Sequence, residues 1–256
     1  MFRSVEEIHL ARFNSATSSH FLDAYEGFLD SEILQQEATQ PSKTFAPSSI
    51  RCRRLSWFRL RGVPPEPETS VDRTLNFTAQ VGTSCHRVIQ ENLSNLLGAD
   101  WIDVGTFLDS CDRPYSYTYA KSGPETLIQI DNPPIKFAPD GIIRYENKIR
   151  LLEIKTSEYS SFNSLTGPKP QHIDQIKCYC TLLNIDSAIV LYQDRQYGGF
   201  KCYEINIAPG DMQSIWSMFK DVLAHVDSGL APSKLPANDP WCSPSRCRYY
   251  NKCKEW

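Results

Sequence analysis

The stretch APDGIIRYENKIRLLEIKTS, residues 138–157, carries charged residues on a segment otherwise typical of a buried strand. Its apolar and branched residues predict strands at 140–146 and 149–155, with a turn at 146–148 between them. Glu153 and Lys155 are two positions apart and therefore lie on the same face of the second strand. A buried carboxylate and ammonium cost free energy unless they are paired or bind a metal.

Two interpretations of this hairpin are open. In the first, the strand leaves the core and Glu153 and Lys155 lie on its exposed face. In the second, Asp140 and Glu153, near the ends of the two arms, converge on one cation, because carboxylate oxygens suit Mg²⁺ or Mn²⁺. Lys155 would then lie beside a water and a scissile phosphate. That is the smallest set of groups for metal-assisted phosphodiester hydrolysis.

The rest of the chain predicts an α/β domain, a sheet with helices around it. Apolar residues recur at helical spacing over 79–97, and further helices are expected at about 170–184 and from Pro209 to about Asp227. Strands are expected at 126–130, 187–194 and 200–207. An N-terminal helix from Ser18 or Ser19 to about Ala38 carries an apolar stripe. We expect it to pack on the body of the protein; docking to a protein partner is the alternative.

Composition narrows the class of protein. The 256-residue chain has a net charge of −3, so no overall basic character indicates nucleic acid. It has neither an apolar run long enough for a membrane span nor a signal-peptide pattern, so we expect a cytoplasmic or nucleoid-associated protein without membrane contact. Nine cysteines in such a chain favour metal ligation by some of them over disulfides.

Several motifs together resemble the RecB-like branch of the PD-(D/E)xK nucleases. Pro139-Asp140 is followed by Glu153-Ile154-Lys155, as in the family's catalytic motif, and Gly82 and His86 resemble its Gly-x-x-x-His motif. Gln175 and Tyr179 match its Gln-x-x-x-Tyr element on the next helix. The resemblance implies that His86 is a third metal ligand beside Asp140 and Glu153, and that Gln175 and Tyr179 support the site and contact DNA. The family usually has a Glu four residues after the His, where this chain has Gln90.

The cysteines extend the resemblance. The segment WCSPSRCRYYNKC, residues 241–253, holds Cys242, Cys247 and Cys253, and Cys52 lies far upstream. This arrangement resembles the iron–sulfur branch, which includes AddB-type nucleases and CRISPR-associated RecB-like exonucleases, and it implies a [4Fe–4S] cluster that ties the two segments together. The first gap is two residues longer than usual there, and structural Zn²⁺ or unligated thiols are the alternatives. Other cysteines are predicted to be plain core residues, namely Cys85, Cys178, Cys180 and Cys202.

A basic and aromatic segment precedes the nuclease motifs. Single-stranded DNA suits cations interleaved with aromatic rings, and the candidate DNA-binding residues are Arg51, Arg53, Arg54, Trp57 and Arg59, with Tyr179. A solvated basic helix is the alternative. The resemblance implies a restriction-endonuclease-like core over 46–256, with 1–45 as an N-terminal helical arm.

The sequence therefore predicts a DNA nuclease dependent on Mn²⁺ or Mg²⁺. An exonuclease acting on single strands or DNA ends is favoured. The alternatives are a structure-specific endonuclease on the same fold, or a non-catalytic DNA-binding or assembly subunit with a vestigial site.

Overall fold

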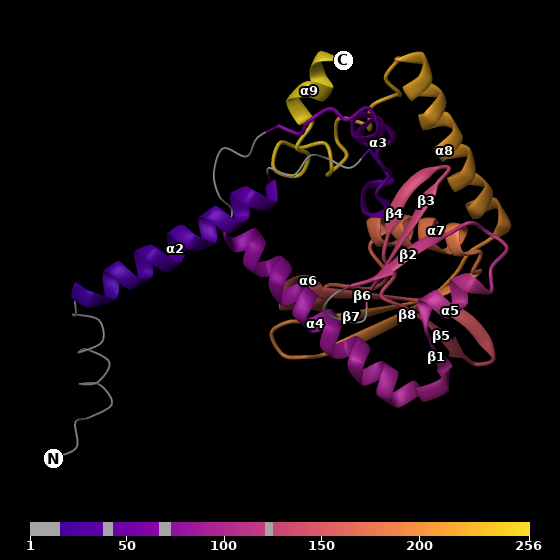
Figure 1. The fold of residues 1–256 in the computed structure, drawn as a ribbon, viewed down its shortest axis with the longest axis horizontal. Coiled ribbons are helices and arrows are strands. Elements are labelled where there is room, and N and C mark those ends of the chain that lie inside the picture. The colour runs from indigo at the N-terminus through magenta and orange to yellow at the C-terminus, as the bar shows by residue number, and fades with distance from the viewer. Residues whose placement is uncertain (1–15, 38–42, 67–72, 121–124) are drawn as a thin grey trace. The chain divides into compact units, whose positions relative to one another are not determined.

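The computed structural model describes residues 16–37, 43–66, 73–120 and 125–256, with the backbone alone at 16–19 and 35–37. The chain divides into two compact units, residues 1–40 with 68–79, and residues 41–67 with 80–256. The first contains helix α2 (Ala16–Glu37) and the beginning of helix α4 (Arg73–Leu97). The second contains the sheets and every site considered below (Figure 1).

A mixed five-stranded sheet forms the centre of the larger unit, in the order β1-β5-β6-β7-β8. Strands β6 and β7 are parallel and the other neighbours are antiparallel. Hairpin β5–β6 is the predicted one, and positive φ values at Glu146 and Asn147 close its two-residue turn. The strands are β1 (Trp101–Ile102), β5 (Gly141–Tyr145), β6 (Lys148–Ser157), β7 (Ser187–Asp194) and β8 (Phe200–Asn206).

A second, three-stranded antiparallel sheet contains β2 (Ser116–Tyr119), β3 (Thr126–Asp131) and β4 (Pro134–Phe137). The strand predicted at 126–130 is β3, which belongs to this sheet and not to the central one. Phe45, fully buried, forms an isolated bridge to Ile135 of β4. Thus residues just before the basic segment are part of the core.

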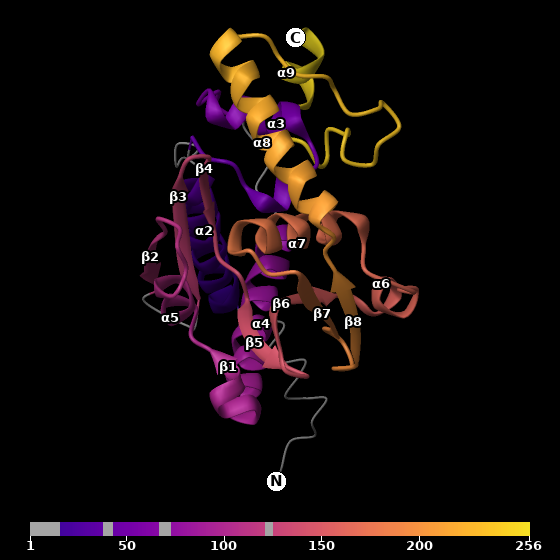
Figure 2. The same cartoon turned by 90° about the vertical axis from the view of Figure 1, so that its right-hand side faces the viewer.

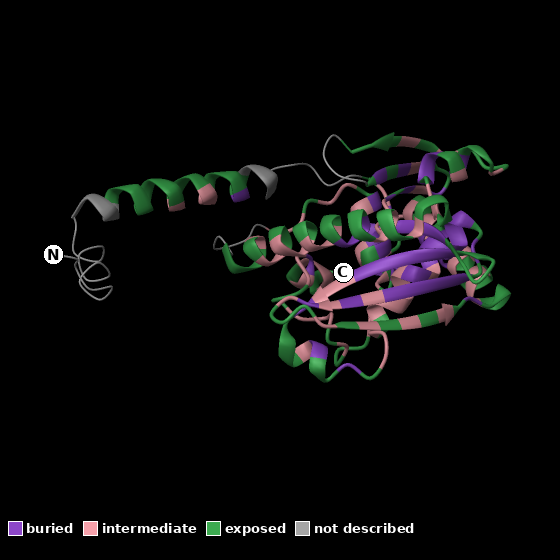
Figure 3. Ribbon diagram, turned by 90° about the horizontal axis from the view of Figure 1, so that it is seen from below, coloured by how far each residue is buried: buried purple, intermediate pink, exposed green. Residues whose placement is uncertain are grey.

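Helices cover both faces of the central sheet (Figures 1 and 2). On one face, Ile89 of α4 packs against Leu152 and Ile154 of β6. The other face belongs to the larger core cluster, which includes Leu151 of β6 and Ile176 of α7 (Pro170–Leu183). Because strand side chains alternate, Glu153 and Lys155 point toward α7. Figure 3 shows the inner strands largely buried.

The remaining helices are α3 (Arg53–Leu60), α5 (Val104–Asp109), α6 (Tyr159–Asn163), α8 (Pro209–Ser228) and α9 (Tyr250–Glu255), with short 3-10 turns at Pro47–Ser49 and Gly98–Asp100. The predictions for α7, β7, β8 and α8 are confirmed to within about two residues. No described helix combines the length and apolar character needed to cross a bilayer. The mixed sheet flanked by helices confirms the predicted α/β class.

Helix α2 carries several exposed apolar side chains. It begins at Ala16, and the predicted end at Ala38 lies outside the described residues. Large apolar side chains of the predicted stripe are exposed, among them Phe21 at 77% and Phe28 at 57%, whereas Ile33 is buried. Arg73 contacts the helix through ion pairs with Glu26 at 2.7 Å and Asp30 at 2.6 Å. Helical spacing identified the stripe, but it does not specify that anything covers it.

Candidate active site

Asp140 joins the hairpin to helix α4. One carboxylate oxygen, Oδ2, accepts a hydrogen bond from the Ile154 amide at 2.6 Å, and Oδ1 lies 3.1 Å from Nδ1 of His86. The main-chain carbonyl of Asp140 accepts from Nε2 of Gln90 at 2.6 Å. Burial lowers the pKa of His86, but the hydrogen bond to Asp140 and its charge outweigh this and raise the pKa. The resemblance paired Asp140 with His86, and the structure brings them into contact.

Glu153 is buried, with a side chain only 2% exposed, so the interpretation in which the strand leaves the core here is wrong. Its Oε1 lies 2.5 Å from Nζ of Lys155. Its Oε2 is buried and has no hydrogen-bond partner among the described residues. Burial, followed by the charge of Asp140, raises the pKa of Glu153 to about 7. An unpartnered buried carboxylate oxygen is costly, and it is the kind of atom that a cation satisfies.

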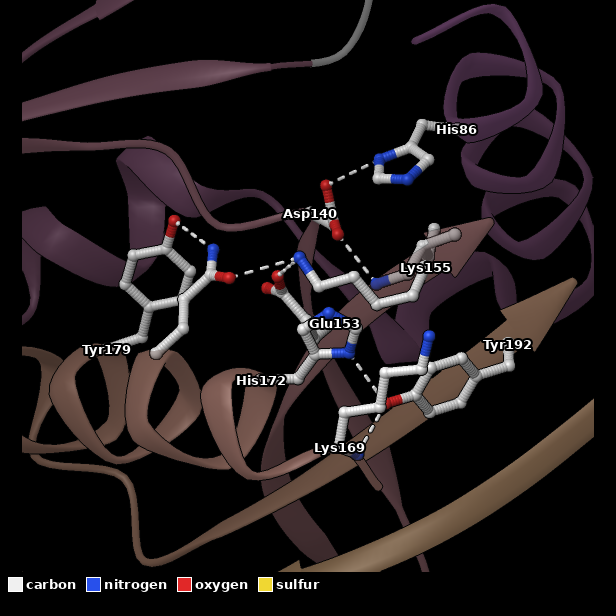
Figure 4. Close-up of polar contacts among 10 residues, drawn as sticks. His86, Asp140, Glu153, Lys155, Lys169, His172, Tyr179 and Tyr192 are labelled. Carbon is white, nitrogen blue, oxygen red and sulfur yellow. Dashed lines mark hydrogen bonds and ion pairs between the residues drawn. The ribbon is translucent and has the colours of Figure 1, made fainter. Parts of the chain in front are cut away.

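Besides its ion pair with Glu153, Lys155 forms a hydrogen bond with a side chain of α7. Its Nζ donates to Oε1 of Gln175 at 3.1 Å, and Nε2 of Gln175 donates to Oη of Tyr179 at 3.0 Å. Tyr179 is only 6% exposed and its ring stacks on Phe137. The expected DNA contact of Tyr179 is therefore wrong, because its ring is covered by protein. Tyr179 instead positions Gln175, which positions the ammonium (Figure 4).

The raised pKa of Glu153 predicts a pH dependence of stability in the metal-free protein. A carboxyl whose pKa rises from 4.5 to about 7 on folding binds its proton more tightly in the folded state. Its contribution is therefore complete below the unfolded value and is lost as the pH rises through the folded one. Thermal unfolding with a chelator should show stability falling between about pH 5 and about pH 7. The Glu153→Gln variant should lose this slope; an equal slope in both proteins would contradict the assignment.

Sequence reasoning missed a histidine on α7 that is half-buried beside the candidate site. The Oη of Tyr192 accepts the Lys169 amide at 3.1 Å and lies 2.7 Å from Nδ1 of His172. Burial, followed by the charges of Lys155 and Lys169, lowers the pKa of His172 to about 3. Spacing could have identified His172 as a candidate site residue, because it precedes Gln175 by three residues and therefore lies on the same side of the helix. Gln90 follows His86 by four residues and therefore lies on the same side of α4, and it too contacts Asp140.

The residues present fit a divalent cation by their chemistry. Asp140, Glu153 and His86 offer carboxylate oxygens and an imidazole nitrogen, and one of those oxygens is unpartnered. Within the described residues, however, no group of three or more His, Cys, Asp or Glu side chains is arranged to hold a metal ion. The hydrogen bond between His86 and Asp140 engages Nδ1 of the imidazole and Oδ1 of the carboxylate.

The four cysteines predicted as cluster ligands line one cavity of about 210 Å³. Cys52 caps the start of α3, accepting the Leu55 amide at 3.4 Å, and the C-terminal segment supplies Cys242, Cys247 and Cys253. Burial, then the neighbouring thiols, raises the pKa of Cys52 to about 11. All nine cysteines lie in the described residues, and none of them forms a disulfide. Four thiols around one cavity fit a structural metal or cluster in chemical type, although they too fall short of a metal-holding arrangement in the described chain.

Polar contacts fasten the C-terminal segment next to this cavity. The Glu66 carboxylate accepts from the Lys252 amide at 2.9 Å and from Nδ2 of Asn251 at 2.8 Å. The Glu66 amide donates to the Arg248 carbonyl at 2.7 Å. The two distant segments are thus joined by the protein itself.

The cysteines predicted to be core residues differ in burial. Cys178 and Cys180 are fully buried, as predicted. Cys202 is exposed, so its assignment to the core is wrong, because β8 is an edge strand with one face open to solvent. Cys85 is half-buried.

The basic segment is mostly occupied by protein contacts. Trp57 is fully buried and its Nε1 donates to the His225 carbonyl at 3.0 Å, so the predicted stacking of bases on this ring is wrong. Arg54 is also buried, and its Nε donates to the Pro232 carbonyl at 2.8 Å. The physical reason is that α3 is covered by α8 and the C-terminal segment. Ion pairs engage Arg51 with Asp239 and Asp174, and Arg53 with Asp221, and Arg59 is half-buried.

No protein-family model and no curated protein sequence matches the chain. Among solved structures, it is similar to SSO0001, with 19% identity over 83% of this chain and 98% of that one, and a TM-score of 0.42. It is also similar to the alkaline exonuclease LHK-Exo of Laribacter hongkongensis, with 14% identity over 76% and 93% and a TM-score of 0.39. LHK-Exo in complex with dAMP gives 15% identity, 69% and 87% coverage and 0.37. At these TM-scores a shared function does not follow, so function has to be inferred from the site residues.

Proposed function

We propose that the protein is a metal-dependent nuclease that hydrolyses phosphodiester bonds in DNA, as an exonuclease on single strands or ends. The observation that supports this most is the meeting of Asp140, Glu153, His86 and Lys155, with Oε2 of Glu153 buried and unpartnered. A purely structural ion pair has no use for the unpartnered oxygen, whereas a cation site does.

Each residue then has a distinct role. Asp140, Glu153 and His86 would hold Mn²⁺ or Mg²⁺, and the imidazole favours Mn²⁺. When bound, such an ion polarises a phosphate and lowers the pKa of a water. Lys155 offsets negative charge beside the scissile phosphate and orients the attacking water. Gln175, held by Tyr179, keeps the ammonium in place.

The thiol-lined cavity would hold a [4Fe–4S] cluster, with structural Zn²⁺ as the alternative, on Cys52, Cys242, Cys247 and Cys253. Its role is structural, because these residues belong to the segments joined at α3 and the C-terminal end. A protein partner on the exposed stripe of α2 is a further part of the proposal.

The direct experiment is anaerobic purification followed by incubation with end-labelled linear and circular DNA, single- and double-stranded, with Mn²⁺ or a chelator. Loss of label from linear single strands, with circles intact, is expected. Cleavage of circles would favour the endonuclease, and DNA binding without any cleavage would favour the scaffold subunit. Lys155→Ala is the inactive control, and Lys148→Ala, an exposed lysine of the same strand, should remain active.

A metal titration tests the role of His86. His86→Ala should lower cleavage most at low Mn²⁺ and recover in part at excess Mn²⁺, because the two carboxylates remain. The apparent activation constant should rise about 10- to 100-fold, the range for losing a group that supports a metal. An unchanged constant would mean that His86 neither binds the metal nor supports its ligands. His225→Ala, a histidine on α8, is the matched control.

A further inference from the structure

The hydrogen bonds of Tyr192 fix the proton position on His172. Tyr192 is 1% exposed, and its oxygen already accepts the Lys169 amide. Its single hydroxyl proton needs an acceptor, and Nδ1 of His172, 2.7 Å away, is the one that the described contacts provide. Nδ1 is therefore unprotonated, and the neutral ring carries its hydrogen on Nε2. The two rings also stack, with centroids 5.6 Å apart.

The same ring lies at the edge of the candidate active site. Figure 4 shows His172 beside Glu153 and Lys155. Among the described residues, no hydrogen bond is formed by Nε2, and the ring is half-buried. The nearby ammonium groups of Lys155 and Lys169 add positive charge around it. An N–H group without a protein acceptor, close to two cations, suits an anionic oxygen from a ligand.

We propose that His172 is a substrate-binding residue whose Nε2–H donates a hydrogen bond to a non-bridging oxygen of a DNA phosphate next to Lys155. This rests on the proposed function and adds a residue to it. Because Nδ1 is occupied by Tyr192 and Nε2 already carries hydrogen, the ring is unable to take a proton from water. His172 therefore binds substrate and is not the general base.

DNA binding without metal separates this role from catalysis. We would measure the anisotropy of a labelled single-stranded oligonucleotide in a chelator. Loss of a hydrogen bond to a charged group predicts about 10- to 100-fold weaker binding by His172→Ala. His172→Gln, which can place an amide N–H near the Nε2 position, should recover most of the affinity. Tyr192→Phe should weaken binding less than His172→Ala, since only the orientation is lost. His225→Ala should bind like wild type.

Single methylphosphonate linkages, each replacing one charged phosphate oxygen, identify the contact. At one linkage wild type should lose clearly more affinity than His172→Ala, because the variant has already lost the hydrogen bond and only the charge interaction with Lys155 remains to be lost. Additive losses at every linkage, or wild-type binding by a folded His172→Ala, would overturn the inference while leaving the nuclease intact. If the wild-type protein neither binds nor cleaves DNA, the proposed function is wrong, and the inference falls with it.

Discussion

Replacing Glu153 by Gln is expected to abolish DNA cleavage while leaving the protein folded. The side chain is buried between β6 and α7, so an amide of the same shape keeps the packing. It removes the negative charge that a cation requires and that the Lys155 ammonium faces at 2.5 Å. Metal coordination contributes several kcal/mol to such reactions, so the rate should fall by about 10³-fold or more.

The unfolding temperature of Glu153→Gln shows whether a loss of cleavage is due to unfolding. Because burial raises the pKa of Glu153, the ionised carboxyl destabilises the metal-free fold at neutral pH, and Glu153→Gln should unfold at the same temperature as wild type or higher. Glu91→Gln, an exposed glutamate on α4, is the matched control and should keep full activity. Near-normal cleavage by folded Glu153→Gln at saturating Mn²⁺ would exclude the proposed site.

Replacing Cys52 by Ser should destabilise the protein strongly, if its cavity holds a metal or cluster as proposed. Binding by a structural thiolate site is on the order of 10 kcal/mol of folding free energy. Losing one ligand should therefore lower the unfolding temperature by about 10 °C or more, given about 2–4 °C per kcal/mol for a domain of this size. Cys242, Cys247 and Cys253 should behave alike, because they line the same cavity.

The other cysteines provide matched controls of graded burial. Cys202→Ser changes an exposed thiol and should alter the unfolding temperature little. Cys178→Ala truncates a fully buried side chain and should cost about 1–3 kcal/mol without changing metal content. A brown protein with about four irons would favour [4Fe–4S], and a colourless one with zinc would favour the alternative. A stable, metal-free protein indifferent to Cys52→Ser would exclude both.

Local signals predicted much of the part of the fold that holds the candidate site. Hairpin β5–β6, helix α7 and strands β7 and β8 follow from alternation, helical spacing and turn residues close together in the sequence. The same signals placed Glu153 and Lys155 on one face, and the structure adds that Glu153 is buried.

The predictions that were wrong concern residues whose environment is set by segments distant in the sequence. Trp57 was predicted to stack on DNA bases because arginines surround it in the sequence. Its ring is instead covered by α8 and the C-terminal segment, which lie far along the chain. Cys202 read as core because nothing local reveals that β8 is an edge strand. The sequence gives no sign of the role of His172, because that role depends on a hydrogen bond with the hydroxyl of Tyr192 on strand β7.

The contact between α3 and residues 249–256 has a consequence for biosynthesis. Phe58 stacks on Tyr249, and Trp57 lies edge-on to Trp256, so these rings of α3 have partners that are synthesised much later in translation. Until residues 249–256 leave the ribosome, the α3 rings lack these covers and present apolar surface to chaperones and proteases. A premature stop shortly before Tyr249 would keep every candidate catalytic residue and still yield a chain vulnerable to degradation.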